Sequence, residues 1–149
     1  MITREQLLDC AGRDRFVSPS HVVDQKKIDA FADLSGDRAF LHVDPDLAKQ
    51  TSFGGTVAHG MLVLSMMSGM AFEVVPQVER AVTSISCGFR DVRFLLPVPV
   101  GAKIWGAFQF DAAKARGRKD VMVLLGCTVH VEGVDRPALT ADWDLLYRF

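Results

Sequence analysis

The sequence predicts an α+β protein in which a curved antiparallel sheet wraps one long central helix, and three observations support this. The chain of 149 residues has the length of one domain, so 1–149 is expected to be a single domain. The only long apolar run, Met61–Phe72, is typical of a buried helix. The clearest strand patterns all follow that helix, which favours segregated helices and strands over alternating ones.

Short elements are expected before the apolar run. Phe16–Val23 has the pattern of a first strand, and Asp24 can cap a helix that ends near Gly36. A second short helix is expected over Asp46–Gln50, because a proline precedes it and favours a helix start. The stretch that begins at Asp37, between the two helices, is expected to be a polar loop.

Alternating hydrophobicity after the apolar run predicts four antiparallel strands. From Leu139 to Phe149, apolar side chains occupy every second position, as in a strand with one buried and one wet face. Val121–Val131 repeats this pattern, and 104–110 repeats it more loosely. The first strand, 85–96, changes parity near Arg90 or Asp91, which predicts a β-bulge there. Turn residues separate the strands at 97–101, 113–120 and 133–137.

Composition excludes several classes of protein. A net charge of −1 lacks the excess of Lys and Arg typical of nucleic-acid binding. The 3 cysteines are widely spaced and form no CxxC pair, which argues against a disulfide framework or a zinc site. The N-terminal residues lack the apolar stretch of a secretory signal, and Met61–Phe72 is too short to cross a bilayer, which needs about 20 residues. We therefore expect a cytoplasmic protein that binds no membrane.

A basic cluster falls within a predicted hairpin turn. Its members are Lys114, Arg116, Arg118 and Lys119. We interpret them as solvated charges and not as a phosphate clamp.

Residue types that suit chemistry gather in the segment 31–70. Asp37 and His42 are close enough in sequence to converge on one water molecule. His59 directly precedes Gly60, which opens the apolar helix and therefore offers unpaired backbone N–H groups. This combination predicts an active site.

Three motifs in this order resemble those of the MaoC-like, (R)-specific enoyl-CoA hydratases. Residues 36–45 read GDRAFLHVDP, 53–62 read FGGTVAHGML, and 92–101 read VRFLLPVPVG. The resemblance runs from about Asp24 to the end of the chain. It implies the hot-dog fold, in which an antiparallel sheet wraps a helix, and a homodimer with active sites at the junction.

The resemblance also implies the role of each site residue. Asp37 and His42 would form the catalytic pair that grips one water, and the backbone N–H of Gly60 would contact the thioester oxygen. His59 and Ser68 are further candidates for substrate binding. Their alternatives are structural: His59 could only bond backbone at the helix entry, and Ser68 could only allow close packing.

The implied reaction is the reversible addition of water to a trans-2-enoyl-CoA, which gives the (R)-3-hydroxyacyl-CoA. It requires a base at the water, a proton for Cα and stabilisation of charge on the carbonyl oxygen. The substrate is the acyl-CoA itself, and neither a metal nor another cofactor is expected.

The chain departs from the family pattern where many members carry Asn-Pro, because it has Ala39 and Phe40 there. Three alternatives stay open. One is a 3-hydroxyacyl thioester dehydratase acting on acyl carrier protein, although the HFPxH signature of those enzymes is missing. Another is a thioesterase using Glu73, and the third is a non-catalytic hot-dog subunit that binds an acyl thioester.

Overall fold

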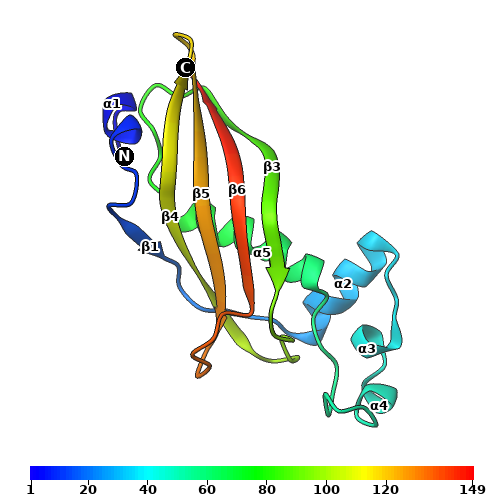
Figure 1. The fold of residues 1–149 in the computed structure, drawn as a ribbon. Coiled ribbons are helices and arrows are strands. Elements are labelled where there is room, and N and C mark those ends of the chain that lie inside the picture. Colours follow the sequence, from blue (N-terminus) through cyan, green and yellow to red (C-terminus); the bar gives the residue numbers. More distant parts are fainter.

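The computed structural model describes residues 1–149 and is organised around one antiparallel sheet. The strands are β1 (Arg15–Val17), β2 (His21–Val22), β3 (Thr83–Phe94), β4 (Lys103–Arg116), β5 (Asp120–Val131) and β6 (Leu139–Arg148). Their order is β1-β4-β5-β6-β3, and β2 also pairs with β4. Figure 1 shows the four long strands side by side, with β3 at one edge. The predicted α+β fold is therefore confirmed.

The central helix, α5 (Gly60–Val74), runs along one face of this sheet (Figure 1). Its Met67 and Met70 are buried in the same apolar cluster as Phe108 of β4. The other side of the helix is open, since the side chains of Met61 and Phe72 are 55% and 84% exposed. The helix predicted to be buried is therefore covered on only one side within one chain, because the sheet ends at a free β3 edge and does not close.

The long strands contain one expected and two unexpected irregularities. The register of β3 against β6 shifts between Arg90 and Arg93, which confirms the predicted bulge. Two other shifts, between Ser86 and Gly88 in β3 and between Phe110 and Ala112 in β4, do not correspond to any sequence prediction.

The predicted turn over 113–120 is wrong, because β4 continues to Arg116 and β5 begins at Asp120. Ala113 and Ala115 pair with Val123 and Val121, so backbone bonding extends the ladder to a tight turn at its tip.

The first predicted strand is broken in two. Pro19, which has no backbone N–H, lies between β1 and β2 and interrupts the pairing with β4. The buried Ser18 partly replaces the missing bonds, since its hydroxyl accepts the N–H of Gly106 at 2.9 Å.

The remaining helices are α1 (Arg4–Leu8), α2 (Gln25–Ser35), α3 (Phe40–Val43) and α4 (Pro45–Ala48). The Asp24 side chain caps α2 by accepting the N–H of Lys27, and Gly36 ends the helix with φ 79°. The helix predicted over 46–50 is therefore present but starts at Pro45, whereas α3 was predicted as loop. Residues far along the chain help to form α3, because the carbonyl of Leu41 accepts the N–H of Val57.

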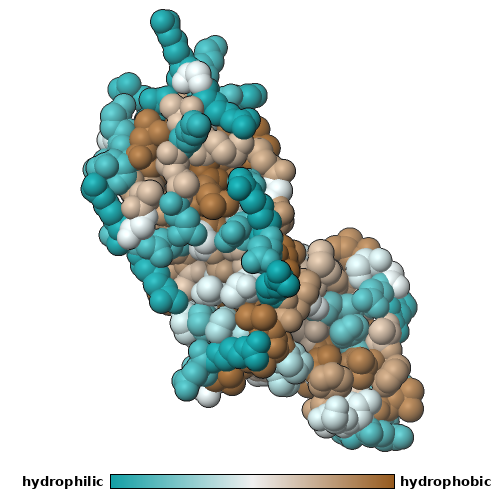
Figure 2. Space-filling model, in the orientation of Figure 1, coloured by the Kyte–Doolittle hydropathy of each residue, from teal (hydrophilic) through white to brown (hydrophobic).

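Helices α2, α3 and α4 form a segment that projects beyond one end of the sheet (Figure 1). Figure 2 shows apolar side chains on this projecting segment and polar ones around the tip of the β4–β5 hairpin, at the opposite end. No helix in the structure combines the length and apolar character needed to cross a membrane.

Candidate active site

The fold brings Asp37, His42 and His59 together at the junction of the projecting segment and α5. A carboxylate oxygen of Asp37 and one ring nitrogen from each histidine all lie within 4.8 Å of one another. Asp37 is exposed, follows the left-handed turn at Gly36, and accepts the N–H of Ala39 at 3.3 Å. The predicted acid and histidine therefore meet at a position that solvent can reach.

Hydrogen bonding determines which nitrogen of His42 is free. Its Nδ1 lies 2.7 Å from the carbonyl oxygen of Val57. A carbonyl oxygen can only accept, so Nδ1 carries the hydrogen and Nε2 keeps a lone pair. The residue is half-buried. Its Nε2 is therefore available to accept a proton from water.

His59 lies behind this pair and is only 2% exposed. Its Nε2–H donates to the main-chain carbonyl of Asp37 at 2.9 Å, and its ring stacks on His42 with centroids 3.8 Å apart and planes at 27°. Phe31 of α2 lies against the ring, at 5.0 Å between centroids. The Nδ1 atom of His59 is buried without a hydrogen-bond partner. His59 is therefore a buried residue that contacts both Asp37 and His42, the pair called the dyad below.

Gly60 begins α5, and its backbone N–H has no partner within the chain. It lines an apolar cavity of about 280 Å³ with Phe53, Val63, Phe94 and Ala138 among its neighbours. A Cβ at Gly60 would lie 2.8 Å from the ring of Phe94. Within the chain, the Phe94 ring therefore excludes a side chain at this position.

Ser68, two turns farther along α5, is half-buried, and its hydroxyl donates to the carbonyl of Ser65 at 2.7 Å. It lines a second cavity, of about 570 Å³, whose walls are mainly apolar and include Phe72, Trp143 and Tyr147. Ser68 follows Gly60 by eight residues, which corresponds to about 12 Å along a helix. The second cavity is therefore farther toward the C-terminal end of α5 than the first.

Gln25, at the start of α2, is a residue of the site that sequence reasoning missed. Its side-chain amide donates to the main-chain carbonyl of His42 at 2.7 Å and to Asp29 at 2.8 Å, and its oxygen accepts the hydroxyl of Thr56 at 2.6 Å. No motif marks this glutamine, because its partners His42 and Thr56 come close to it only in the folded chain.

Asp37, His42 and His59 have the residue types of a metal site, and their ligand atoms are close enough to consider one. However, the lone pair of an imidazole nitrogen lies in the ring plane, and these two rings stack instead of pointing at a common centre. Both rings are also fixed by bonds to main-chain carbonyls. The arrangement suits hydrogen bonding to a water better than joint coordination of an ion.

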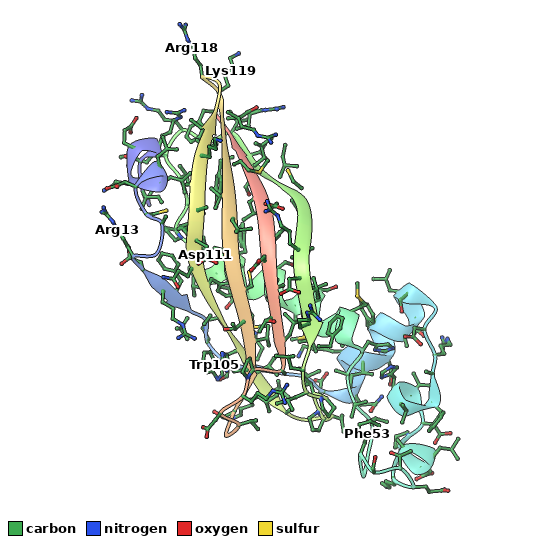
Figure 3. All side chains as sticks on the ribbon, in the orientation of Figure 1. Arg13, Phe53, Trp105, Asp111, Arg118 and Lys119 are labelled. Atoms are coloured by element: carbon green, nitrogen blue, oxygen red, sulfur yellow. The ribbon has the colours of Figure 1, made fainter.

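Other chemically notable residues lie away from this site. Glu73, near the end of α5, pairs with His21 at 3.0 Å. His130 stacks on Trp105 with centroids 4.2 Å apart. In Figure 3, Arg118 and Lys119 lie at the hairpin tip, at the opposite end of the molecule from Phe53.

Comparison with known proteins relates this geometry to a family. A model described as the MaoC like domain matches residues 9–132. The chain is 39% identical to nodulation protein N of Rhizobium leguminosarum bv. viciae over 128 residues, which cover 85% of this chain and 80% of that protein. It is 32% identical to 3-hydroxyacyl-thioester dehydratase Z of Mycobacterium tuberculosis over 120 residues, 80% of this chain and 79% of that one.

Solved structures give the same relationship. The (R)-hydratase from A. caviae involved in PHA biosynthesis superposes with a TM-score of 0.72 at 28% identity. The match covers 89% of this chain and 92% of that chain.

Proposed function

Since this chain belongs to the MaoC-like dehydratase family of hot-dog proteins, we propose that it reversibly adds water to a trans-2-enoyl-CoA to give the (R)-3-hydroxyacyl-CoA. The observation that carries the proposal is the free Nε2 of His42, held near the Asp37 carboxylate at the start of a helix whose first N–H is unpaired. This set provides a base for water and a donor for a developing oxyanion.

In the proposed reaction, Asp37 and His42 hold one water. As its oxygen bonds to C3 of the enoyl group, one water proton passes to the dyad and the π electrons move toward the thioester oxygen. The N–H of Gly60 and the positive end of the α5 dipole stabilise that oxygen. A proton from the dyad then reaches C2, which completes the addition of water. Dehydration follows the same steps in reverse.

We assign the acyl chain to the apolar spaces along α5. Gly60 lines the smaller cavity and Ser68 lines the larger one, so a chain that starts at the Gly60 N–H and follows the helix passes Ser68. His59 acts from behind the dyad in this proposal, because only 2% of its surface is exposed.

We further propose that the protein works as a homodimer, as the family resemblance implies. The edge strand β3 and the neighbouring helix face leave large apolar side chains uncovered, with Phe72 84%, Val82 79% and Phe94 51% exposed. An edge strand with such side chains is a template for pairing with another chain. Sedimentation velocity should give twice the chain mass at micromolar concentration, and a monomer would contradict this assignment.

The function is tested by the absorbance of the thioester-conjugated double bond. Purified protein should lower it with crotonyl-CoA or longer enoyl-CoAs, and should raise it from (R)- but not (S)-3-hydroxyacyl-CoA. Asp37→Asn, which keeps the size of the side chain, should abolish most of the rate. Failure with every chain length, or full activity in this variant, would refute the proposal.

The direction of reaction and the carrier need a separate experiment. A relative named as a 3-hydroxyacyl-thioester dehydratase favours dehydration as a second candidate, on either CoA or acyl carrier protein. The same acyl group on each carrier should be compared by kcat/KM. If neither is turned over and calorimetry detects binding of enoyl-CoA, the chain is a non-catalytic binding subunit.

A further inference from the structure

We propose that Gln25 is a positioning residue that keeps His42 in the orientation needed to act on water, an inference that rests on the proposed function. Gln25 does not belong to any of the motifs that identify the family. Its role follows from its contacts, because its side chain joins three separate segments around the dyad.

The first contact supports the short helix that carries His42. Helix α3 has only 4 residues, too few to be stable by its own hydrogen bonds. Its last carbonyl groups therefore need outside donors. The carbonyl of Leu41 receives the N–H of Val57 at 3.0 Å, and the carbonyl of His42 receives the amide of Gln25 at 2.7 Å.

The second contact reaches the segment that holds the imidazole ring. The side-chain oxygen of Gln25 accepts a hydrogen bond from the hydroxyl of Thr56 at 2.6 Å, and Thr56 is only 2% exposed. Thr56 directly precedes Val57, whose carbonyl fixes the Nδ1–H of His42. Gln25 therefore links the main chain of His42 to the segment that anchors its ring.

This link constrains the distance between the main chain of His42 and the Val57 carbonyl that holds its ring. It therefore constrains the direction of the Nε2 lone pair of His42. Both N–H groups of the Gln25 amide are used, because the second donates to Asp29 one turn along α2. Besides Gln25, only the His42 ring itself and the main-chain bond from Val57 to Leu41 connect these two segments. A shift of about 1 Å at a reacting group can cost about 100-fold in rate, so loosening this link should lower turnover without removing any group that touches substrate.

The kinetic test compares Gln25→Leu with Asp29→Ala. Gln25→Leu should lower kcat by about 10- to 100-fold and change KM by less than about threefold. Asp29→Ala removes only the third contact and should leave both constants near wild type. A second variant, Gln25→Glu, keeps the size of the side chain and an acceptor for Thr56 but removes the donors to His42, and should resemble Gln25→Leu.

A double-variant cycle shows whether Gln25 acts through His42. In a His42→Ala background, Gln25→Leu should have no further effect on the residual rate, because the ring that it positions is absent. An equal loss in both backgrounds, or unchanged kcat in Gln25→Leu, would overturn the inference.

A spectroscopic readout separates this inference from the proposed function. Long-range ¹⁵N NMR of the wild type should show His42 in the single tautomer with hydrogen on Nδ1, and Gln25→Leu should show a mixture of tautomers. If the protein turns over no thioester but these spectra differ as expected, the proposed function fails and the positioning role stands. Identical single-tautomer spectra would overturn the positioning role itself.

Discussion

Replacing His42 by asparagine isolates the chemistry that we assign to its ring. The amide nitrogen of asparagine can occupy the place of Nδ1 and keep the 2.7 Å bond to the carbonyl of Val57, whereas nothing replaces Nε2. General acid–base catalysis by one positioned side chain contributes about 10²- to 10⁴-fold. At about 1.36 kcal/mol per factor of ten, this corresponds to about 2.7–5.4 kcal/mol of transition-state stabilisation.

The assay follows initial rates of enoyl-thioester hydration, with kcat and KM determined separately and thermal unfolding measured on the same samples. His42→Asn should lose kcat by the factor above, with little change in KM or Tm. The matched control is His130→Asn, because His130 stacks on Trp105 in the sheet and lies outside the proposed chemistry. It should keep wild-type rates.

A combined variant tests whether the dyad acts as a unit. Asp37→Asn and His42→Asn together should cost hardly more than His42→Asn alone, as expected for groups that share one water. The reasoning is refuted if His42→Asn keeps more than about a hundredth of the wild-type kcat, since the lower bound for the proposed role is about 100-fold.

Three further predictions follow from single contacts. Gly60→Ala should lower the free energy of unfolding by about 1 kcal/mol and reduce kcat/KM, because its Cβ would lie 2.8 Å from the Phe94 ring. Denaturant titration should show that adding Phe94→Ala restores part of this stability. If it does not, the contact between Gly60 and Phe94 is contradicted. Ala39→Asn supplies α3 with the side-chain cap that it lacks and should raise the free energy of unfolding by about 0.5–1 kcal/mol, seen as a higher Tm. An unchanged Tm would contradict this capping role. Hydrogen bonds from Arg90 lower the pKa of Asp144, so their contribution to the free energy of unfolding is complete above about pH 4 and is lost as the pH falls through that lowered pKa. The urea midpoint of the wild type should therefore drop more steeply toward pH 3 than that of Arg90→Gln. Parallel curves for the two proteins would contradict this prediction.

The strand predictions succeeded where local pattern and structure depend on the same residues. The alternation from Leu139 predicts β6, and its buried side chains Leu139, Ala141, Leu145 and Tyr147 are those that the pattern assigns to one face. The hairpin around 113–120 was mispredicted because alanines and charged residues there resemble a turn, whereas pairing with β5 keeps them in a strand.

Patterns along the chain were enough to predict the fold class, the cap of α2 and the meeting of Asp37 with His42. Period-two alternation, a capping side chain and motif spacing are all local or ordered along the chain. Which nitrogen of His42 is free depends on the folded chain, since the carbonyl of Val57 that fixes it lies 15 residues away. The structure also revealed the contact of Gln25 with His42, across 17 residues. The packing of Phe94 over Gly60 likewise depends on how the sheet lies against α5. Such contacts join side chains whose partners become neighbours only on folding, and no local pattern encodes them.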